Sequence, residues 1–184
     1  MRTFFAVLIA TWFGSGFIPR IPKVTTRGFA GTWGSLAALP LCICTLWLCH
    51  QLPLLDGWML YASIVGSVML LGAWSLEPAM AWLSGWLVRH RQRDRKMFHD
   101  QYEVVIDEVF GMLISCAPLY FLPDVPLWLG LGLSFLCFRI FDGTKPWPVR
   151  YFDQQKSPLS IIWDDGVAGL MAAAVVTIIL QVFF

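Results

Sequence analysis

Acidic residues stand beside apolar stretches at three places in this chain. These places contain Asp107-Glu108, Asp164-Asp165, and Asp142 with the cations Arg139 and Lys145. An ionisable group in or beside a membrane span is energetically unfavourable, so its presence there usually indicates a function. Oxygen ligands without a His or Cys cluster favour a hard ion, and Mg²⁺ is typically held by a few carboxylates together with water and substrate phosphate. The residue types therefore predict a metal site that also receives a phosphate.

Two of the acidic motifs share one layout. Three apolar residues precede two adjacent acids, and a glycine follows one acid four residues later, as Gly111 follows Asp107 and Gly169 follows Asp165. Residues four apart lie on the same face of a helix. Glycine at that place would let another backbone or a lipid headgroup come close to the carboxylate. A simpler reading, in which Asp107 and Asp164 only cap helices near their N-termini, stays open for each motif alone.

The third motif lies at the end of an apolar segment that runs in the opposite direction. Arg139 and Asp142 are three residues apart on one helix face, so an internal ion pair is one reading. The prolines after Lys145 end the helix and stiffen its exit, which would hold Lys145 and Arg150 near Asp142 for phosphate recognition. Arg150 could instead be a positive-inside anchor. Together, the three helix ends would gather five carboxylates and two cations.

The composition shows which environment surrounds these motifs. Hydrophobic residues make up 58% of the chain, charged residues 14%, and the mean hydropathy is +0.66. These values are too apolar for a soluble domain of this length. The apolar runs that approach or reach the span length of about 20 residues are 31–51, 57–76, 104–122, 125–141 and 166–184. The segments 104–122 and 125–141 reach this length only if Asp107, Glu108 and Arg139 lie inside the helices, near their ends.

We expect an all-α, polytopic helical membrane protein that forms one membrane-embedded domain over residues 1–184. It should have five or six transmembrane or re-entrant helices plus an amphipathic interfacial helix. The interfacial helix is expected over 77–96, where tryptophans precede a run of arginines. The apolar segment 3–18 is short and contains glycines before a proline, so it could cross the bilayer, re-enter it or lie along its surface.

The basic residues predict the orientation in the membrane. They gather at 20–27, 89–96 and 139–156, whereas the loops near 52–56 and 123–126 have none. Under the positive-inside rule the three basic loops are cytoplasmic. The acidic motifs flank the same loops, so we expect the site to face the cytoplasm. The formal net charge of +1 gives no reason to expect nucleic acid as a partner, and no obligate protein partner is evident.

The motifs taken together resemble those of the bacterial phosphatidylglycerophosphatase A family. The matching motifs are Gly31-Thr32-x-Gly34-Ser35, His99-Asp100, Asp107-Glu108-x-x-Gly111, Phe138-Arg139-x-x-Asp142-x-x-Lys145-Pro146-Trp147-Pro148 and Asp164-Asp165-x-x-Ala168-Gly169. The resemblance runs from about residue 28 to the C-terminus. Ala30 departs from the family pattern, in which a proline is expected before the Gly-Thr pair, and the arginine-rich segment before His99 is not part of the motif set.

The resemblance implies a Mg²⁺-dependent phosphatase of the bacterial inner membrane that removes the terminal phosphate of the membrane phospholipid phosphatidylglycerophosphate to give phosphatidylglycerol. The residues that it implies in catalysis are Asp107, Glu108, Arg139, Asp142, Lys145, Asp164 and Asp165. Mg²⁺ would be held by the five acids of this set. Substrate contacts are expected from Thr32, Ser35, His99, Asp100, Arg139, Lys145 and Arg150. Arginine and lysine would stabilise charge that develops on the phosphate.

A different class of function uses the same acids in a small ion-binding transporter or an assembly protein. A transporter would need polar groups that continue toward the opposite face, and the other halves of the predicted helices are almost purely apolar. The five cysteines lie in apolar runs without metal-ligand spacing, which is typical of unreactive packing residues. We therefore expect oxygen chemistry at the three acidic motifs and no role for the thiols.

Overall fold

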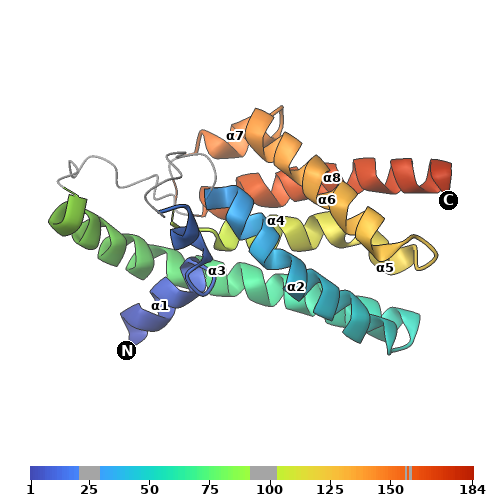
Figure 1. Cartoon of the computed structure of the whole chain (residues 1–184), viewed down its shortest axis with the longest axis horizontal. Helices are drawn as coiled ribbons and strands as arrows, with labels where there is room; N and C mark the ends of the chain where they lie inside the picture. Colours follow the sequence, from blue (N-terminus) through green and yellow to red (C-terminus); the bar gives the residue numbers. More distant parts are fainter. Residues whose placement is uncertain (21–29, 92–102, 156, 158) are drawn as a thin grey trace.

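The computed structural model of the 184-residue chain describes residues 1–20, 30–91, 103–155, 157 and 159–184, and within them it is all-α. The helices are α1 (Arg2–Ala10), the 3₁₀ helix η1 (Ser15–Arg20), α2 (Ala30–His50), α3 (Leu54–Arg91), α4 (Ile106–Cys116), α5 (Pro118–Phe121), α6 (Leu127–Thr144), α7 (Val149–Asp153) and α8 (Ser160–Phe183). Figure 1 shows α2, α3, α6 and α8 as long helices gathered around α4.

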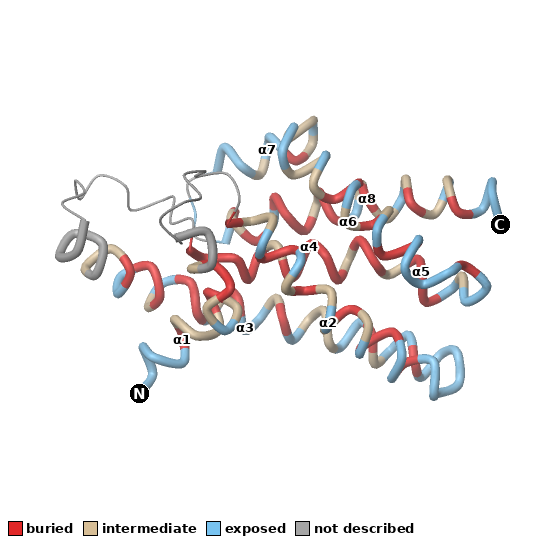
Figure 2. Tube along the Cα trace, in the orientation of Figure 1, coloured by how far each residue is buried: buried red, intermediate tan, exposed pale blue. Residues whose placement is uncertain are grey.

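Four helices of the described residues are long and apolar enough to cross a membrane: α2, α3 over Leu54–Gly85, α6 and α8. Their outward faces carry large exposed apolar side chains such as Trp47, Leu70 and Ile178, which suit contact with lipid rather than water. Figure 2 shows this separation, with exposed residues along the outer helices and buried ones around α4. The expectation of an all-α membrane protein is confirmed.

Helix α3 is the longest element, with 38 residues. It includes Pro78 and continues through the segment 77–91, for which an interfacial helix was expected, without interruption. Residues 92–96, the rest of that expected helix, lie outside the described part of the chain. Helix α1 has nine residues and packs along α3. At 1.5 Å per residue it rises about 14 Å, which is too short to cross a hydrocarbon core of about 30 Å.

Helix α4 has only 11 residues and ends where Pro118 follows Ala117. Proline lacks the amide hydrogen that would continue the helix, so the apolar run 104–122 forms two short helices instead of one span. At this break the Ala117 amide bonds to the Ile114 carbonyl, and the Tyr61 hydroxyl of α3 donates to the Leu113 carbonyl at 2.6 Å. A buried carbonyl without a partner is unfavourable, so this bond stabilises the end of α4 in an apolar interior.

Candidate active site

Glycines bring α4 and α8 together where the acidic motifs lie. A Cβ added to Gly169 would come within 2.5 Å of the Gly111 carbonyl oxygen, and one added to Gly111 would come within 2.8 Å of the Asp165 carbonyl oxygen. No side chain fits at either place, so the two backbones pack directly against each other. One helical turn away, at the start of both helices, this contact sets Asp107 beside Asp165. The sequence allowed another backbone or a lipid headgroup to come close beside these carboxylates, and in the structure it is the backbone of the facing helix.

The acids of α4 and α8 form a compact group, which we call the acid triad: Asp107, Glu108 and Asp165. One oxygen from each carboxylate lies within 4.8 Å of the others. Asp107 and Asp165 are only 9% and 4% exposed. Two unit charges at 4.8 Å repel by roughly 3.5 kcal/mol at an effective dielectric constant of 20. The triad therefore needs protons or a cation, and three carboxylate oxygens suit a hard divalent ion such as Mg²⁺.

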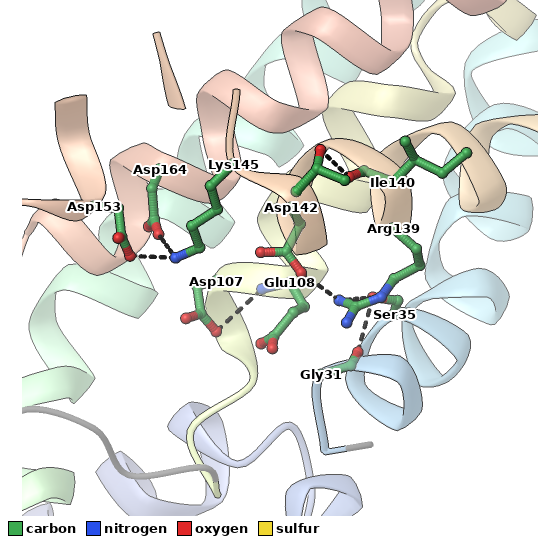
Figure 3. A network of polar contacts seen from close by, with 11 residues as sticks. Gly31, Ser35, Asp107, Glu108, Arg139, Ile140, Asp142, Lys145, Asp153 and Asp164 are labelled. Atoms are coloured by element: carbon green, nitrogen blue, oxygen red, sulfur yellow. Dashed lines mark hydrogen bonds and ion pairs between the residues drawn. The ribbon is translucent and has the colours of Figure 1, made fainter. Parts of the chain in front are cut away.

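Arg139 of α6 lies on the side of the triad that faces α2. Its Nη1 is 2.7 Å from Oδ2 of Asp142, and it also donates to the Ser35 hydroxyl at 3.5 Å. Ser35 in turn donates to the Gly31 carbonyl at 2.9 Å, and Figure 3 shows this chain of contacts beside Glu108. A Cβ on Gly31 would lie 2.4 Å from a Glu108 carboxylate oxygen, so a side chain at this position would have to displace the ends of Glu108 and Arg139.

Lys145 lies on the other side, at the end of α6. It adopts a left-handed backbone conformation with φ +45°, and its amide donates to the Phe141 carbonyl. This conformation is uncommon outside glycine and is unfavourable by about 1–3 kcal/mol. The Lys145 ammonium donates to Asp164 at 2.8 Å and also to Asp153 (Figure 3). Burial alone would lower the pKa of this ammonium, but the two carboxylate hydrogen bonds outweigh burial and raise the pKa, so Lys145 stays charged.

The acid triad, Asp142 and Lys145 line one cavity of about 450 Å³. Its acidic and basic lining residues are Asp107, Glu108, Asp142, Lys145, Asp153, Asp164 and Asp165. Two buried carboxylate oxygens, Oε2 of Glu108 and Oδ1 of Asp164, have no hydrogen-bond partner among the described residues. A buried acceptor without a partner indicates a ligand, an ion or water at that place. The cavity can therefore hold cations on its carboxylates next to two positive side chains.

The structure places most of the expected site residues together. Six of the seven catalytic candidates line the cavity, and the seventh, Arg139, reaches it through Asp142. Among the expected substrate contacts, Ser35 bonds to Arg139, Thr32 is half-buried and does not line the cavity, and Arg150 is exposed on α7 away from the lining. His99 and Asp100 lie outside the described residues.

Sequence reasoning missed the lining residues between α7 and α8. Asp153 binds Lys145, and Gln155, Ser157 and Ser160 also line the cavity. The available signal was the short chain distance from Lys145 to Asp165, which limits how far the residues between them can lie from the two motifs. No carboxylate pair or glycine spacing marks Asp153, so the pattern that identified the other acids did not include it.

A second cavity, of about 520 Å³, lies at the far end of α2, beside α5. Its lining is mostly apolar and includes Trp47, Leu119, Leu122 and Val125. The ring of His50 lies there with Nε2 at 3.1 Å from the Tyr120 carbonyl oxygen. Among the described residues, the carboxylates of the first cavity do not continue into this one. The geometry therefore gives no support to a polar transport route between the two ends.

Comparisons with known proteins agree with this site. The family model for phosphatidylglycerophosphatase A matches residues 8–180. A phosphatidylglycerophosphatase A of Escherichia coli is 33% identical over 169 residues, which are 91% of this chain and 79% of that protein. The Haemophilus influenzae protein of the same name is 31% identical, over 92% of this chain and 85% of its own length.

A Bacteroides thetaiotaomicron relative, which carries the provisional name phosphatidylinositol-3-phosphatase, is 32% identical over 96% of this chain and 94% of its own length. No solved structure matches the chain. The family match covers every acid that lines the cavity. The chain belongs to the phosphatidylglycerophosphatase A family.

Proposed function

We propose that this phosphatase removes the terminal phosphate of phosphatidylglycerophosphate, that it depends on Mg²⁺, and that its site faces the cytoplasm. The observation that carries the proposal is the single cavity in which the acid triad lies beside Lys145 and the Arg139–Asp142 pair. Carboxylates that hold a divalent ion next to two cations are what recognition of a phosphate monoester requires. Two relatives are named phosphatidylglycerophosphatase A, and these names indicate phosphatidylglycerophosphate as the lipid substrate.

The chain's own residues would divide the work as follows. Bound at the acid triad, Mg²⁺ would supply Lewis-acid polarisation of a phosphoryl oxygen. Lys145 would leave its more exposed partner, Asp153, which is 42% exposed at its side chain, and turn its ammonium to the phosphate. Arg139, held in place by Asp142 and Ser35, would stabilise negative charge from the opposite side.

The lipid would not have to leave the bilayer for this reaction. The cavity lies at the start of α8 and the end of α6, two helices long and apolar enough to cross the membrane. Acyl chains can therefore stay among lipids while the headgroup reaches the carboxylates. Exposed aromatic residues next to the cavity, Trp147, Tyr151 and Trp163, have the character of side chains found at the membrane interface.

Phosphate release by the purified protein tests the reaction. We expect release from phosphatidylglycerophosphate with Mg²⁺ and none with a chelator. Phosphatidylinositol 3-phosphate should be offered in parallel at the same concentration, because one relative's name points to that lipid. A clear preference for the inositol lipid would replace the proposed substrate, and absence of release from both lipids would refute a lipid phosphatase.

Cysteine labelling from each side of sealed vesicles tests the orientation. Gln154, next to the cavity, and Asp56, at the start of α3, are both exposed and can be replaced by cysteine. We expect Gln154→Cys to react from the cytoplasmic side and Asp56→Cys from the other side, with the wild-type protein as the background for its own thiols. Reaction of Gln154→Cys only from the non-cytoplasmic side would refute the orientation while leaving the reaction untouched.

A further inference from the structure

We propose that the cavity binds two divalent cations, one at the acid triad and a second at Asp164 together with Asp142. The proposal deepens the proposed function and rests on it for its catalytic meaning. A second ion at this place would give the phosphate a positive partner on the Asp164 side of the cavity, opposite the triad. Two metal ions about 3.5–4 Å apart, stabilising attacking and leaving oxygens, are a recurrent arrangement in phosphatases.

The first reason is the charge that surrounds the cavity. Six carboxylates line it, and the described cations that pair with them are Lys145 and Arg139. When all six are ionised, six negative charges against two positive ones leave four to be balanced by protons or metal ions. One divalent ion would leave two negative charges, and a phosphate monoester would then be repelled. A second divalent ion brings the lining to neutrality before the substrate arrives.

The second reason is an oxygen that the triad does not use. Asp164 is 6% exposed, and its Oδ2 accepts from Lys145 while its buried Oδ1 has no partner among the described residues. Neighbouring residues on a helix point about 100° apart. Asp165 accordingly faces the other two acids of the triad, Asp107 and Glu108, whereas Asp164 faces Lys145. A ligand on Oδ1 of Asp164 is thus separate from one held by the triad's three carboxylates.

Asp142 supplies the complementary donor. It uses Oδ2 for Arg139 and lines the same cavity as Asp164. Its carboxyl also adjoins that of Asp165, so a cation held by Asp142 and Asp164 would lie next to the triad. Lys145 and Arg139 then fix Asp164 and Asp142 each through one oxygen. Oδ1 of Asp164 has no partner among the described residues and is available to a cation, as expected for a ligand held in place by a neighbouring hydrogen bond.

Binding of Mn²⁺ to the metal-free protein in detergent tests the count without any substrate. Bound metal should be measured after equilibrium dialysis, and the electron paramagnetic resonance spectrum should be recorded at saturation. We expect two Mn²⁺ per chain with a spin-coupled signal. In Asp164→Asn we expect one Mn²⁺ with an uncoupled signal. Asp142→Asn should behave in the same way, which keeps the test available if one of the two variants does not fold.

Asp124→Asn is the matched control, because it removes an equal charge from an exposed position in the α5–α6 connection, outside the cavity lining. It should bind two ions, as the wild type does. One Mn²⁺ per wild-type chain at saturation, or two in both cavity variants, would overturn the proposal. The metal count is measured without substrate, so it is independent of the separate phosphate-release assay. Two bound ions without lipid hydrolysis in that assay would refute only the proposed function. Hydrolysis by a protein that binds one ion would refute only the second site.

Discussion

Replacing Gly169 with alanine tests whether the glycine contact between α4 and α8 positions the acids. The added Cβ would lie 2.5 Å from the Gly111 carbonyl oxygen and 3.1 Å from Cβ of Ile114. Ordinary contact needs about 3.4 Å, so the helices must separate by roughly 0.9 Å. Overpacking of this kind destabilises by about 1–3 kcal/mol. Asp165 lies one helical turn from the contact, so this separation would also displace its carboxylate. A displacement of about 1 Å at a reacting centre can lower turnover about 100-fold.

The assay measures phosphate release and thermal unfolding in detergent on the same preparation. Gly66→Ala is the control: it lies within α3, and a Cβ there would meet nothing within 4 Å. The control should keep wild-type turnover, and its free energy of unfolding should rise by up to about 1 kcal/mol, because alanine has a higher helix propensity than glycine. Turnover of Gly169→Ala within twofold of the wild type would refute the reasoning, since the acids would then not depend on the distance between the two helices.

Three further expectations concern the chemistry of the cavity. Activity should disappear in a chelator, return with Mg²⁺ and withstand thiol-blocking reagents; full activity in the chelator would contradict the metal assignment. Asp107→Asn and Asp165→Asn should each lower turnover by orders of magnitude with the fold retained, and the double variant should be scarcely worse; retained activity with a stability loss of about 0.5–2 kcal/mol would indicate caps instead. Lys145→Gly should lower both turnover and the melting temperature, because loss of the cation that pairs with the buried Asp164 outweighs the relief of strain at a φ of +45°; unchanged turnover would exclude an electrostatic role for the ammonium.

The acid–glycine spacing predicted that another backbone or a headgroup could come close beside the carboxylates. Asp107 with Gly111 and Asp165 with Gly169 each occupy one face of a helix, and the structure joins those faces through the two glycines. Helical spacing and residue size are properties of neighbouring residues, so both can be read from a single sequence. The Arg139–Asp142 pair follows from the same helical spacing. The roles of these residues in binding metal and phosphate stay predictions.

Other features depend on long-range contacts that no local pattern states. Asp153 reaches Lys145 only because the chain turns through α7 and returns to α8. The run 104–122 had the composition of a span, but Pro118 ends one helix, and the freed carbonyl of Leu113 finds its donor on Tyr61, 52 residues away. Arg150 follows the Lys-Pro motif closely in sequence, yet α7 leaves it exposed and outside the cavity lining.

The length of α3 determines how far its basic end stands from the lipid. A helix of 38 residues rises about 57 Å. Even at a tilt of about 40°, near the upper end of the range for membrane helices, it rises about 44 Å along the membrane normal, roughly 14 Å more than the hydrocarbon core. If α3 begins at one membrane surface, the backbone at its other end lies beyond the hydrocarbon. With a screening length of about 8 Å at physiological salt, the tilt of α3 decides whether a charge at this end of the helix is close enough to act on anionic headgroups.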